Sequence, residues 1–158
     1  MKIKAFCKGN KLVKVAFEYE FEEFEDEELF FQGYELCEGK LKDKLIDAFN
    51  GKDVDFSDNL DFDLLDRTDF EKEVLKATFT IPKGEIKTYK EVAESLGSKG
   101  YRAVGNALNK NPVAIAIPCH RVVGSDKGLR GFRGGIGMKK EMLMNEGFKF
   151  KKDKLILK

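Results

Sequence analysis

The chain has 158 residues, a length that suits one domain of ordinary size or two small ones. Hydrophobic residues make up 42% of it, which is enough for a buried core and argues against global disorder. No apolar run reaches the roughly 18 residues that a membrane-spanning helix needs, and the first residues lack the apolar segment of a signal peptide. We therefore expect a soluble, intracellular (cytoplasmic) protein with no membrane partner.

Charge is distributed unevenly along the chain. The net charge of +1 argues by itself against a nucleic-acid partner. Residues 1–80, however, carry 12 Lys and Arg against 21 Asp and Glu, a charge of −9, whereas residues 81–158 carry 17 against 7, a charge of +10. A basic half of this kind can bind phosphate groups. The alternative is a pair of solvated surfaces of opposite sign without any anionic partner.

Two strands are predicted near the N-terminus, at residues 2–7 and 12–21. In the second, apolar side chains alternate with mostly charged ones, which predicts a half-buried antiparallel strand. Apolar residues at helical spacing then predict a helix that ends at Gly51. Residues 50–67 are acidic and rich in turn formers, and we expect them to link two domains.

Short helices dominate the second half of the sequence. Thr68 with Glu71, and Thr88 with Glu91, have the spacing of capping boxes that open two helices, the first with Phe70 on its apolar face. A third helix is predicted at about residues 99–109. The helix that opens at Thr88 and the helix at about residues 99–109 are short and are joined by a glycine-containing turn, which fits a helix-turn-helix. The second helix of this pair, at about residues 99–109, is then the recognition helix that contacts DNA.

The expected recognition helix has an unusually smooth surface. It carries Ala103, Gly105 and Ala107, and Arg102 is its only cation before Lys110. A helix that reads bases in the major groove usually presents several long polar side chains. Small residues permit close backbone approach to a narrow groove, although tight packing against another helix is the alternative.

Cysteine and histidine are scarce in this chain. It has Cys7, Cys37, Cys119 and a single histidine, His120. The odd cysteine count does not indicate a disulfide framework, although a bridge between Cys7 and Cys37 stays open. With one histidine and no CxxC pair, we expect no metal site and no cofactor.

Cys119 follows an apolar run and a proline, and His120 comes directly after it. Pro118 forces a turn that presents the thiol at its edge. A thiolate is the reactive form of cysteine, and an adjacent imidazole can lower the thiol pKa. The alternative is that Cys119 is a small apolar residue of the core.

A carboxylate near the C-terminus is a candidate partner for His120. Residues 137–146 read as a helix that Gly147 ends, so that Glu146 lies at the negative end of the helix dipole. A compensating group is expected, and His120 has a catalytic use for such a partner. The alternative is a fully exposed Glu146. The glycine-rich residues 124–137 lack phosphate-loop spacing and are interpreted as a flexible loop that closes over a substrate.

These motifs together resemble the O6-alkylguanine-DNA alkyltransferases. The matching segments are Arg102-Ala-Val-Gly, Asn111-Pro, Ile117-Pro-Cys-His-Arg-Val-Val123, the glycine-rich loop and Asn145-Glu-Gly147. The resemblance implies an α+β chain: an N-terminal small antiparallel-sheet α/β domain at residues 1–67, ribonuclease-H-like, and a C-terminal DNA-binding and alkyl-acceptor domain at residues 68–158. The second is expected to be mostly helical and winged-helix-like, with a helix-turn-helix.

The resemblance also implies a reaction. Cys119 would accept a methyl or alkyl group from O6-alkylguanine in DNA once and irreversibly, activated through a water by His120, which Glu146 orients. Tyr89 would assist base rotation and donate a proton to the guanine. The base must leave the stack, because in-line attack on an O6 substituent is impossible inside a paired duplex.

Further positions are implied on the DNA and around the base. Arg102 would fill the stack in place of the flipped nucleotide, and Asn111 would brace the helix-turn-helix against the active-site turn. The expected DNA-binding residues are Arg102, Ala103, Gly105, Ala107, Asn111 and Arg121; the expected pocket residues are Val122, Arg133 and Gly134. Val122 and Cys119 would accept from the guanine amino group through their main chains, and the backbone N–H of Arg133 would meet O6. The expected partner is double-stranded DNA containing O6-alkylguanine, and the expected state is a monomer.

The sequence departs from the family pattern at a few positions, and three other classes of protein are alternatives to an alkyltransferase. Phe132, Arg133 and Ala114 stand where several relatives have different residues, which leaves the range of accepted alkyl groups undetermined. A lesion binder without chemistry would lack the acceptor cysteine, whereas Cys119 is present. A cysteine hydrolase would need an oxyanion hole and would turn over repeatedly. A plain helix-turn-helix regulator should have more base-reading side chains.

Overall fold

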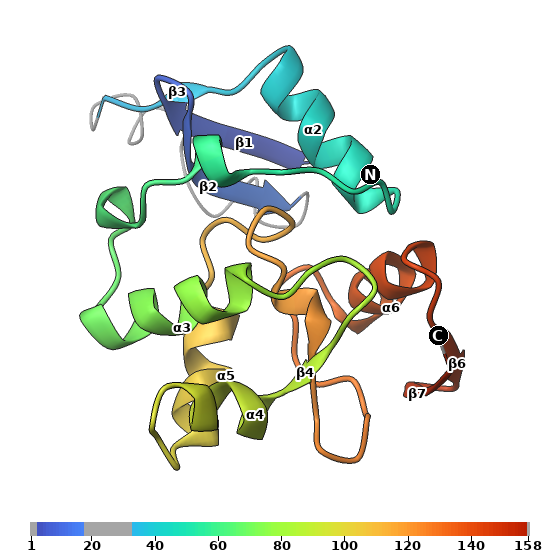
Figure 1. The fold of residues 1–158 in the computed structure, drawn as a ribbon. Coiled ribbons are helices and arrows are strands. Elements are labelled where there is room, and N and C mark those ends of the chain that lie inside the picture. The colour runs from blue at the N-terminus through green and yellow to red at the C-terminus, as the bar shows by residue number, and fades with distance from the viewer. Residues whose placement is uncertain (1–2, 18–32, 158) are drawn as a thin grey trace.

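The computed structural model describes residues 3–17 and 33–157 of the chain. A small antiparallel sheet with one covering helix lies next to a mostly helical part, so the class is α+β as expected (Figure 1). Among the described residues, no helix is both long enough and apolar enough to cross a membrane.

Two N-terminal strands form the centre of the sheet. Strand β1 (Ile3–Lys8) pairs with β2 (Lys11–Phe17) and with the short β3 (Glu35–Leu36), all antiparallel, in the order β2-β1-β3. The two predicted strands are thus confirmed, although residues 18–21 of the second lie outside the described residues. The half-buried prediction is wrong for Ala16, which is fully buried on the face opposite Val15.

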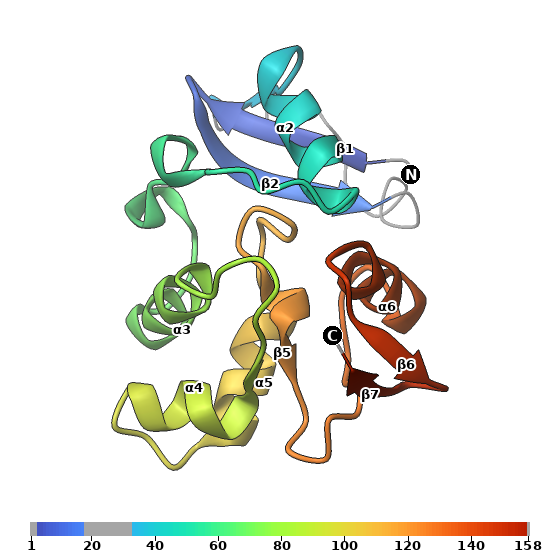
Figure 2. The same ribbon diagram turned by 45° about the vertical axis from the view of Figure 1, so that its right-hand side comes forward.

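Burial of both faces of β2 follows from its neighbours. Helix α2 (Lys40–Phe49) packs along the sheet, and β2 is the strand nearest the helical part (Figures 1 and 2). The edge of β2 meets the turn before Cys119, where Val15 N–H donates to the carbonyl of Pro112 at 2.7 Å. An edge strand is stabilised when its main-chain groups find partners of this kind.

The predicted linker runs from the sheet down to the helical part (Figure 1). It contains two 3₁₀ turns, η2 (Ser57–Asn59) and η3 (Phe62–Leu64), and it buries Phe56 and Leu65. One cluster of buried apolar residues extends from β1 to the C-terminal helix α6 (Ile136–Asn145). The two-domain division at residues 67 and 68 stays a prediction.

Three helices of the second half begin and end as their sequence signals predict. Helices α3 (Asp69–Phe79) and α4 (Tyr89–Ser95) each begin with a complete capping box, in which the threonine and glutamate side chains bond each other's main-chain N–H. Helix α5 (Tyr101–Asn109) follows a turn at Gly97, whose φ is 69°. The face on which Phe70 was expected is buried at Val74, four residues further on, but Phe70 itself lies in the first turn of α3 and is 39% exposed.

The remaining elements surround the turn of Cys119. A single 3₁₀ turn, η4 (Cys119–Arg121), leads into β5 (Val122–Val123), which pairs in parallel with β4 (Lys87–Thr88). Strands β6 (Lys149–Lys151) and β7 (Lys154–Leu157) form a hairpin after α6. Helix α4 lies at the end of the molecule farthest from the sheet, and α5 runs beside it and leads back towards the sheet (Figures 1 and 2).

Candidate functional site

Cys119 lies at the start of η4, at the end of a buried apolar turn. The preceding residues 113–117 are all buried, and Ile115 has a φ of 77°, a conformation that β-branched residues rarely adopt. Pro118 then caps η4, and Cys119 is left 6% exposed. A strained turn over a packed core fixes the thiol in one place, as a reactive side chain requires.

His120 and Glu146 form a buried pair behind the cysteine. The His120 Nε2 atom is 2.7 Å from Glu146 Oε2, and the two side chains are 2% and 1% exposed. The alternative of an exposed Glu146 is therefore wrong. Glu146 follows the last residue of α6, and its main-chain N–H still bonds to carbonyls of that helix, so the dipole that disfavours a carboxylate is present as expected.

Arg121 is a cationic partner of Glu146. Its Nε donates to Glu146 Oε1 at 2.9 Å, and its Nη1 donates to the carbonyl of Ile81 at 2.7 Å. Burial by itself raises the pKa of Glu146, but the hydrogen bonds and charges of His120 and Arg121 outweigh it and lower the pKa to about 2. The expectation that Arg121 contacts DNA does not agree with this placement, because its guanidinium group is held inside the fold.

The bond to an ionised carboxylate fixes the form of the imidazole. Since Glu146 can only accept, Nε2 carries the hydrogen, and the neutral ring then has a free lone pair on Nδ1. Burial lowers the pKa of His120, which keeps the ring neutral near pH 7. Nδ1 is buried and has no hydrogen-bond partner among the described residues. The basic nitrogen of the ring is therefore the atom that lacks a hydrogen bond within the protein.

Tyr89 and Lys139 form a second pair of side chains, and both interact electrostatically with Cys119. Lys139 is 1% exposed, and its Nζ lies 3.3 Å from both the Tyr89 hydroxyl and the Arg130 carbonyl, so that it can donate to each. Burial lowers the pKa of Lys139 to about 8, while the charge of Cys119 opposes that shift. Burial also raises the pKa of Tyr89 to about 12. Tyr89 is therefore held as a phenol beside a buried amine.

Sequence reasoning missed Lys139 altogether. In sequence it is one of two consecutive lysines in a helix, Lys139 and Lys140, and such residues usually project into water. The spacing to Leu143 could have predicted its burial, because residues four apart lie on the same side of a helix and Leu143 is on the buried side of α6.

Asn111 connects the end of α5 to the active-site turn. Its Nδ2 donates to the carbonyl of Ile117 at 3.0 Å, and its Oδ1 accepts from the N–H of Val113 at 2.9 Å. Burial raises the pKa of the Cys119 thiol, whereas Asn111, Lys139 and Arg133 oppose that rise. The resting thiol is thus protonated and needs a base. Asn111 is 1% exposed, so it braces the turn from inside rather than lying on the surface.

A cavity of about 370 Å³ opens over Tyr89 and the exposed side of α5. Its walls include Tyr89, Arg102, Gly105, Asn106, Asn109 and Arg130. Arg102 and Ala103 are exposed at the start of α5, and Gly105 faces the Tyr89 ring, where an added Cβ would lie 4.0 Å away. Ala107 was expected at the DNA, but it is 2% exposed because it packs into the core. Asn106, Asn109 and Arg130 line this cavity and were not singled out from the sequence.

The glycine-rich loop is held by the N-terminal sheet. Arg133 Nη2 donates to the carbonyl of Val15 at 2.6 Å, and its guanidinium group lies 5.0 Å from the Phe17 ring centre. Phe132 meets Phe17 edge to face at 6.0 Å between ring centres. A Cβ on Gly134 would come within 2.6 Å of the Met138 sulfur and 2.9 Å of Phe132, so this position has no room for a side chain. Val122 is fully buried in β5, beside the cysteine turn.

Comparison with known proteins places the chain in a family. A family model described as "6-O-methylguanine DNA methyltransferase, DNA binding domain" matches residues 69–148, about half of the chain. The chain belongs to the O6-methylguanine DNA methyltransferase family. The matched segment contains Cys119, His120, Glu146, Tyr89 and Lys139, that is, the whole cluster described above.

Individual members of the methyltransferase family resemble the chain in sequence and in structure. It is 55% identical over 80 residues to a methylated-DNA–protein-cysteine methyltransferase of Methanosarcina barkeri, and the aligned segment covers 50% of this chain and 51% of that protein. A crystal structure of Mycobacterium tuberculosis OGT in complex with DNA is 44% identical, with a TM-score of 0.60 over 66% of this chain and 63% of that one. The methyltransferase of Pyrococcus kodakaraensis is 30% identical with a TM-score of 0.68, over 87% of each chain. The chain spans about half to two thirds of the length of the first curated relatives that it matches.

Proposed function

We propose that this protein repairs DNA by transferring the alkyl group of O6-alkylguanine to Cys119, once per molecule. The observation that carries the proposal is the buried pair of His120 and Glu146, 2.7 Å apart, next to a cysteine that follows a strained turn. The methyltransferase names of the relatives, and the DNA in one of the solved structures, support the same substrate class.

The first step is removal of the thiol proton. Because the pKa of Cys119 is raised by burial, a base is required, and the Nδ1 lone pair of His120 is the available one. We assign the proton path to a water between Sγ and Nδ1, since buried polar atoms normally have a partner. The imidazolium that forms is stabilised by Glu146, which stays ionised at a pKa of about 2.

The second step transfers the alkyl group. The Cys119 thiolate attacks the carbon attached to O6, so that the S–C bond forms while the C–O6 bond breaks. The electron pair of the broken bond stays on the guanine, and Tyr89 donates the proton that neutralises it. Lys139 lies next to the Tyr89 hydroxyl and offsets the negative charge that the phenol acquires. The product is a thioether, which has no easy route back to a thiol, and the protein is consumed.

Access to the base requires a flipped nucleotide. Helices α4 and α5, joined by the turn at Gly97, would act as a helix-turn-helix that enters the minor groove through the small residues Ala103 and Gly105. Arg102, exposed at the start of α5, would fill the gap in the stack and offset part of the few kcal/mol that extrusion costs. The cavity over Tyr89 is then the entrance for the base.

Mass spectrometry tests the proposal directly. After the protein is mixed with duplex DNA containing O6-methylguanine, we expect the peptide that holds Cys119 to gain one methyl group, with one methyl per protein at completion. Cys119→Ser should bind the DNA without gaining mass. Repeated turnover would favour a hydrolase, and binding of the unchanged protein without any methyl transfer would indicate a lesion binder; either result would contradict the proposal.

A further inference from the structure

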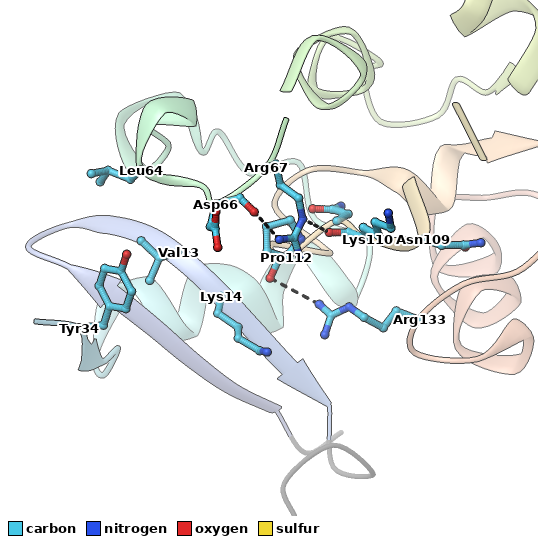
Figure 3. Close-up of a pocket in the computed structure, with 11 residues that line it drawn as sticks. Val13, Lys14, Tyr34, Leu64, Asp66, Arg67, Asn109, Lys110, Pro112 and Arg133 are labelled. Atoms are coloured by element: carbon cyan, nitrogen blue, oxygen red, sulfur yellow. Dashed lines mark hydrogen bonds between the residues drawn. The ribbon is translucent and has the colours of Figure 1, made fainter. Parts of the chain in front are cut away.

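A second cavity lies where the sheet, the linker and the end of α5 meet (Figure 3). It has a volume of about 430 Å³, and its walls carry four cations. Lys14 comes from β2, Arg67 from the linker, Lys110 from the end of α5 and Arg133 from the glycine-rich loop. Among the residues that the structure describes, Asp66 is the one acidic residue in its walls. Four elements that are distant in sequence therefore bring positive charge to one place.

The two guanidinium groups are held in fixed positions. Arg67 Nε donates to the carbonyl of Lys110 at 2.7 Å, and Nη1 donates to the carbonyl of Asp66. Arg133 donates to Val15 and, at 3.4 Å, to the carbonyl of Pro112. Figure 3 shows the two groups approaching Pro112 from different sides. The carbonyl groups that fix Arg67 do not neutralise its charge, so this guanidinium group is arranged in advance for an anion.

Lys110 is the most accessible of these cations. Its side chain is 65% exposed, and its Nζ lies 3.8 Å from Glu71 Oε2, a distance at which an exposed ion pair is weak. Glu71 uses its other oxygen to accept from Thr68 N–H in the capping box of α3. The carboxylate thus has a structural role that an amide could fill, and its negative charge is dispensable for the helix.

The cavity continues the surface that we assign to DNA. Asn109 lines both this cavity and the one over Tyr89 and Arg102. From Arg102 to Lys110 the helix rises by about 12 Å, at about 1.5 Å per residue. This distance corresponds to three or four nucleotides at about 3.4 Å of duplex axis each. A strand that runs along α5 from the flipped nucleotide therefore reaches the second cavity.

We propose that this cavity binds a backbone phosphate of the DNA strand that flanks the flipped nucleotide, with Arg67 and Lys110 as its main contacts. The inference rests on the proposed repair function, because it takes α5 as the DNA-facing helix. The site contributes affinity without reading sequence, since phosphate contacts position a protein on the duplex.

Two substitutions with opposite expected signs test this site. Binding of an undamaged duplex to the full chain is measured by fluorescence anisotropy over a range of salt concentrations. Lys110→Ala should weaken binding by about three- to tenfold at low salt and reduce the slope of log K against log salt by about 0.9. Glu71→Gln, which preserves the capping box, should tighten binding. Lys76→Ala is the matched control: it also removes an exposed, paired lysine, but from a part of α3 outside the cavity, and it should leave the slope unchanged.

The outcomes separate this inference from the proposed function. If the native chain transfers methyl groups and binds DNA, but Lys110→Ala and Glu71→Gln both keep the native affinity and slope, the phosphate site is wrong while the repair function stands. If the native chain binds no DNA, both fail. Inorganic phosphate that stabilises the native chain against heat, without any change in DNA binding on substitution of Lys110, would show a site for free phosphate and overturn the assignment to the strand.

Discussion

Lys139 and Glu146 are buried charged side chains within the site, and each depends on a different set of partners. Glu146 is held by His120 and Arg121, which lower its pKa to about 2, so its charge is compensated. Lys139 has a hydroxyl and a carbonyl as hydrogen-bond partners, and burial lowers its pKa to about 8. Glu146 is thus stabilised as an ion, whereas Lys139 is destabilised as one. A group that costs stability but whose charge acts on the Cys119 thiol is a candidate for function.

Replacement of Lys139 should therefore raise stability and lower activity. The folded pKa of about 8 lies below the ordinary value of 10.5, so the native state binds this proton less tightly than the unfolded state does. The charged amine consequently costs the native state up to about 3 kcal/mol below pH 8, and the cost fades as the pH rises from 8 towards 10.5. Lys139→Met should unfold at higher denaturant concentration than the native chain at pH 7, with a smaller difference at pH 9.5. Its alkyl transfer should be at least about tenfold slower, because Tyr89 and the thiolate lose their neighbouring charge.

Lys140→Met is the matched control for this prediction. Lys140 is the next residue of α6, and its side chain is 32% exposed, with its Nζ 3.9 Å from Asp153 and 5.9 Å from the centre of the Phe150 ring. Its replacement should change neither the transfer rate nor the pH dependence of unfolding. A Lys139→Met protein that is less stable than the native chain at pH 7 would contradict the assigned cost of burial.

At the scale of elements, α5 brings together the two tasks that the proposal assigns to it. One side carries Val104, Ala107 and Leu108 into the core, and the other presents Arg102 and Asn109 to a cavity. Its last turn leads to Asn111, which holds the turn of Cys119. If α5 binds DNA as proposed, it would couple the position of the bound DNA to the position of the thiol.

Arg102→Ala should separate the tasks of α5. Arg102 is exposed and makes no contact that stabilises the fold in the described part of the chain, so the variant should unfold like the native protein. Methyl transfer from O6-methylguanine in a duplex should slow by an order of magnitude or more, because nothing then fills the gap left by the extruded base. Transfer from the free base should be nearly unchanged. Both rates are measured by quenched single-turnover assays, with Lys90→Ala on α4 as a control for loss of charge, and equal losses on the two substrates would contradict the stack-filling role.

Local signals predicted the elements of this fold well, because they act within a few residues. The capping boxes of α3 and α4, and the glycines that end α2 and α6, were all readable from the chain. Cys119, His120 and Glu146 were also recognised, since a motif identified the first two and the helix end marked the third. Lys139 and the inward position of Arg121 were missed, because they depend on which side of α6 and η4 faces the core. The burial of Ala107 has the same cause: composition cannot tell a smooth exposed face from a packed one.

At the scale of the whole molecule, the N-terminal sheet supports the loop that we expect to hold the guanine. The edge of strand β2 contacts this loop and the turn before Cys119. The Val15 carbonyl accepts a hydrogen bond from Arg133, the Val15 N–H donates to the Pro112 carbonyl, and Phe17 packs against Phe132. The loop that the sequence suggested to be a flexible lid is therefore anchored at residues 132–134 by a strand more than a hundred residues away. In the proposed reaction, the contribution of the sheet would be to set the position of the backbone N–H of Arg133 that would meet O6.

Truncation of Phe17 tests this support. Phe17 is 1% exposed, and Phe17→Ala should cost about 3–5 kcal/mol of stability and free Phe132 and Arg133 to move. Alkyl transfer should slow even at temperatures where the variant is fully folded, because a loop displaced by about 1 Å lowers the rate by up to ~100-fold. Leu12→Ala is the control: Leu12 is also fully buried on β2, but at the far end of the strand from the loop, so it should lose stability with little change in rate. Unfolding midpoints and single-turnover rates are measured on both variants. If Phe17→Ala transferred the alkyl group as fast as Leu12→Ala when both variants are equally folded, the sheet would stabilise the protein without positioning its loop.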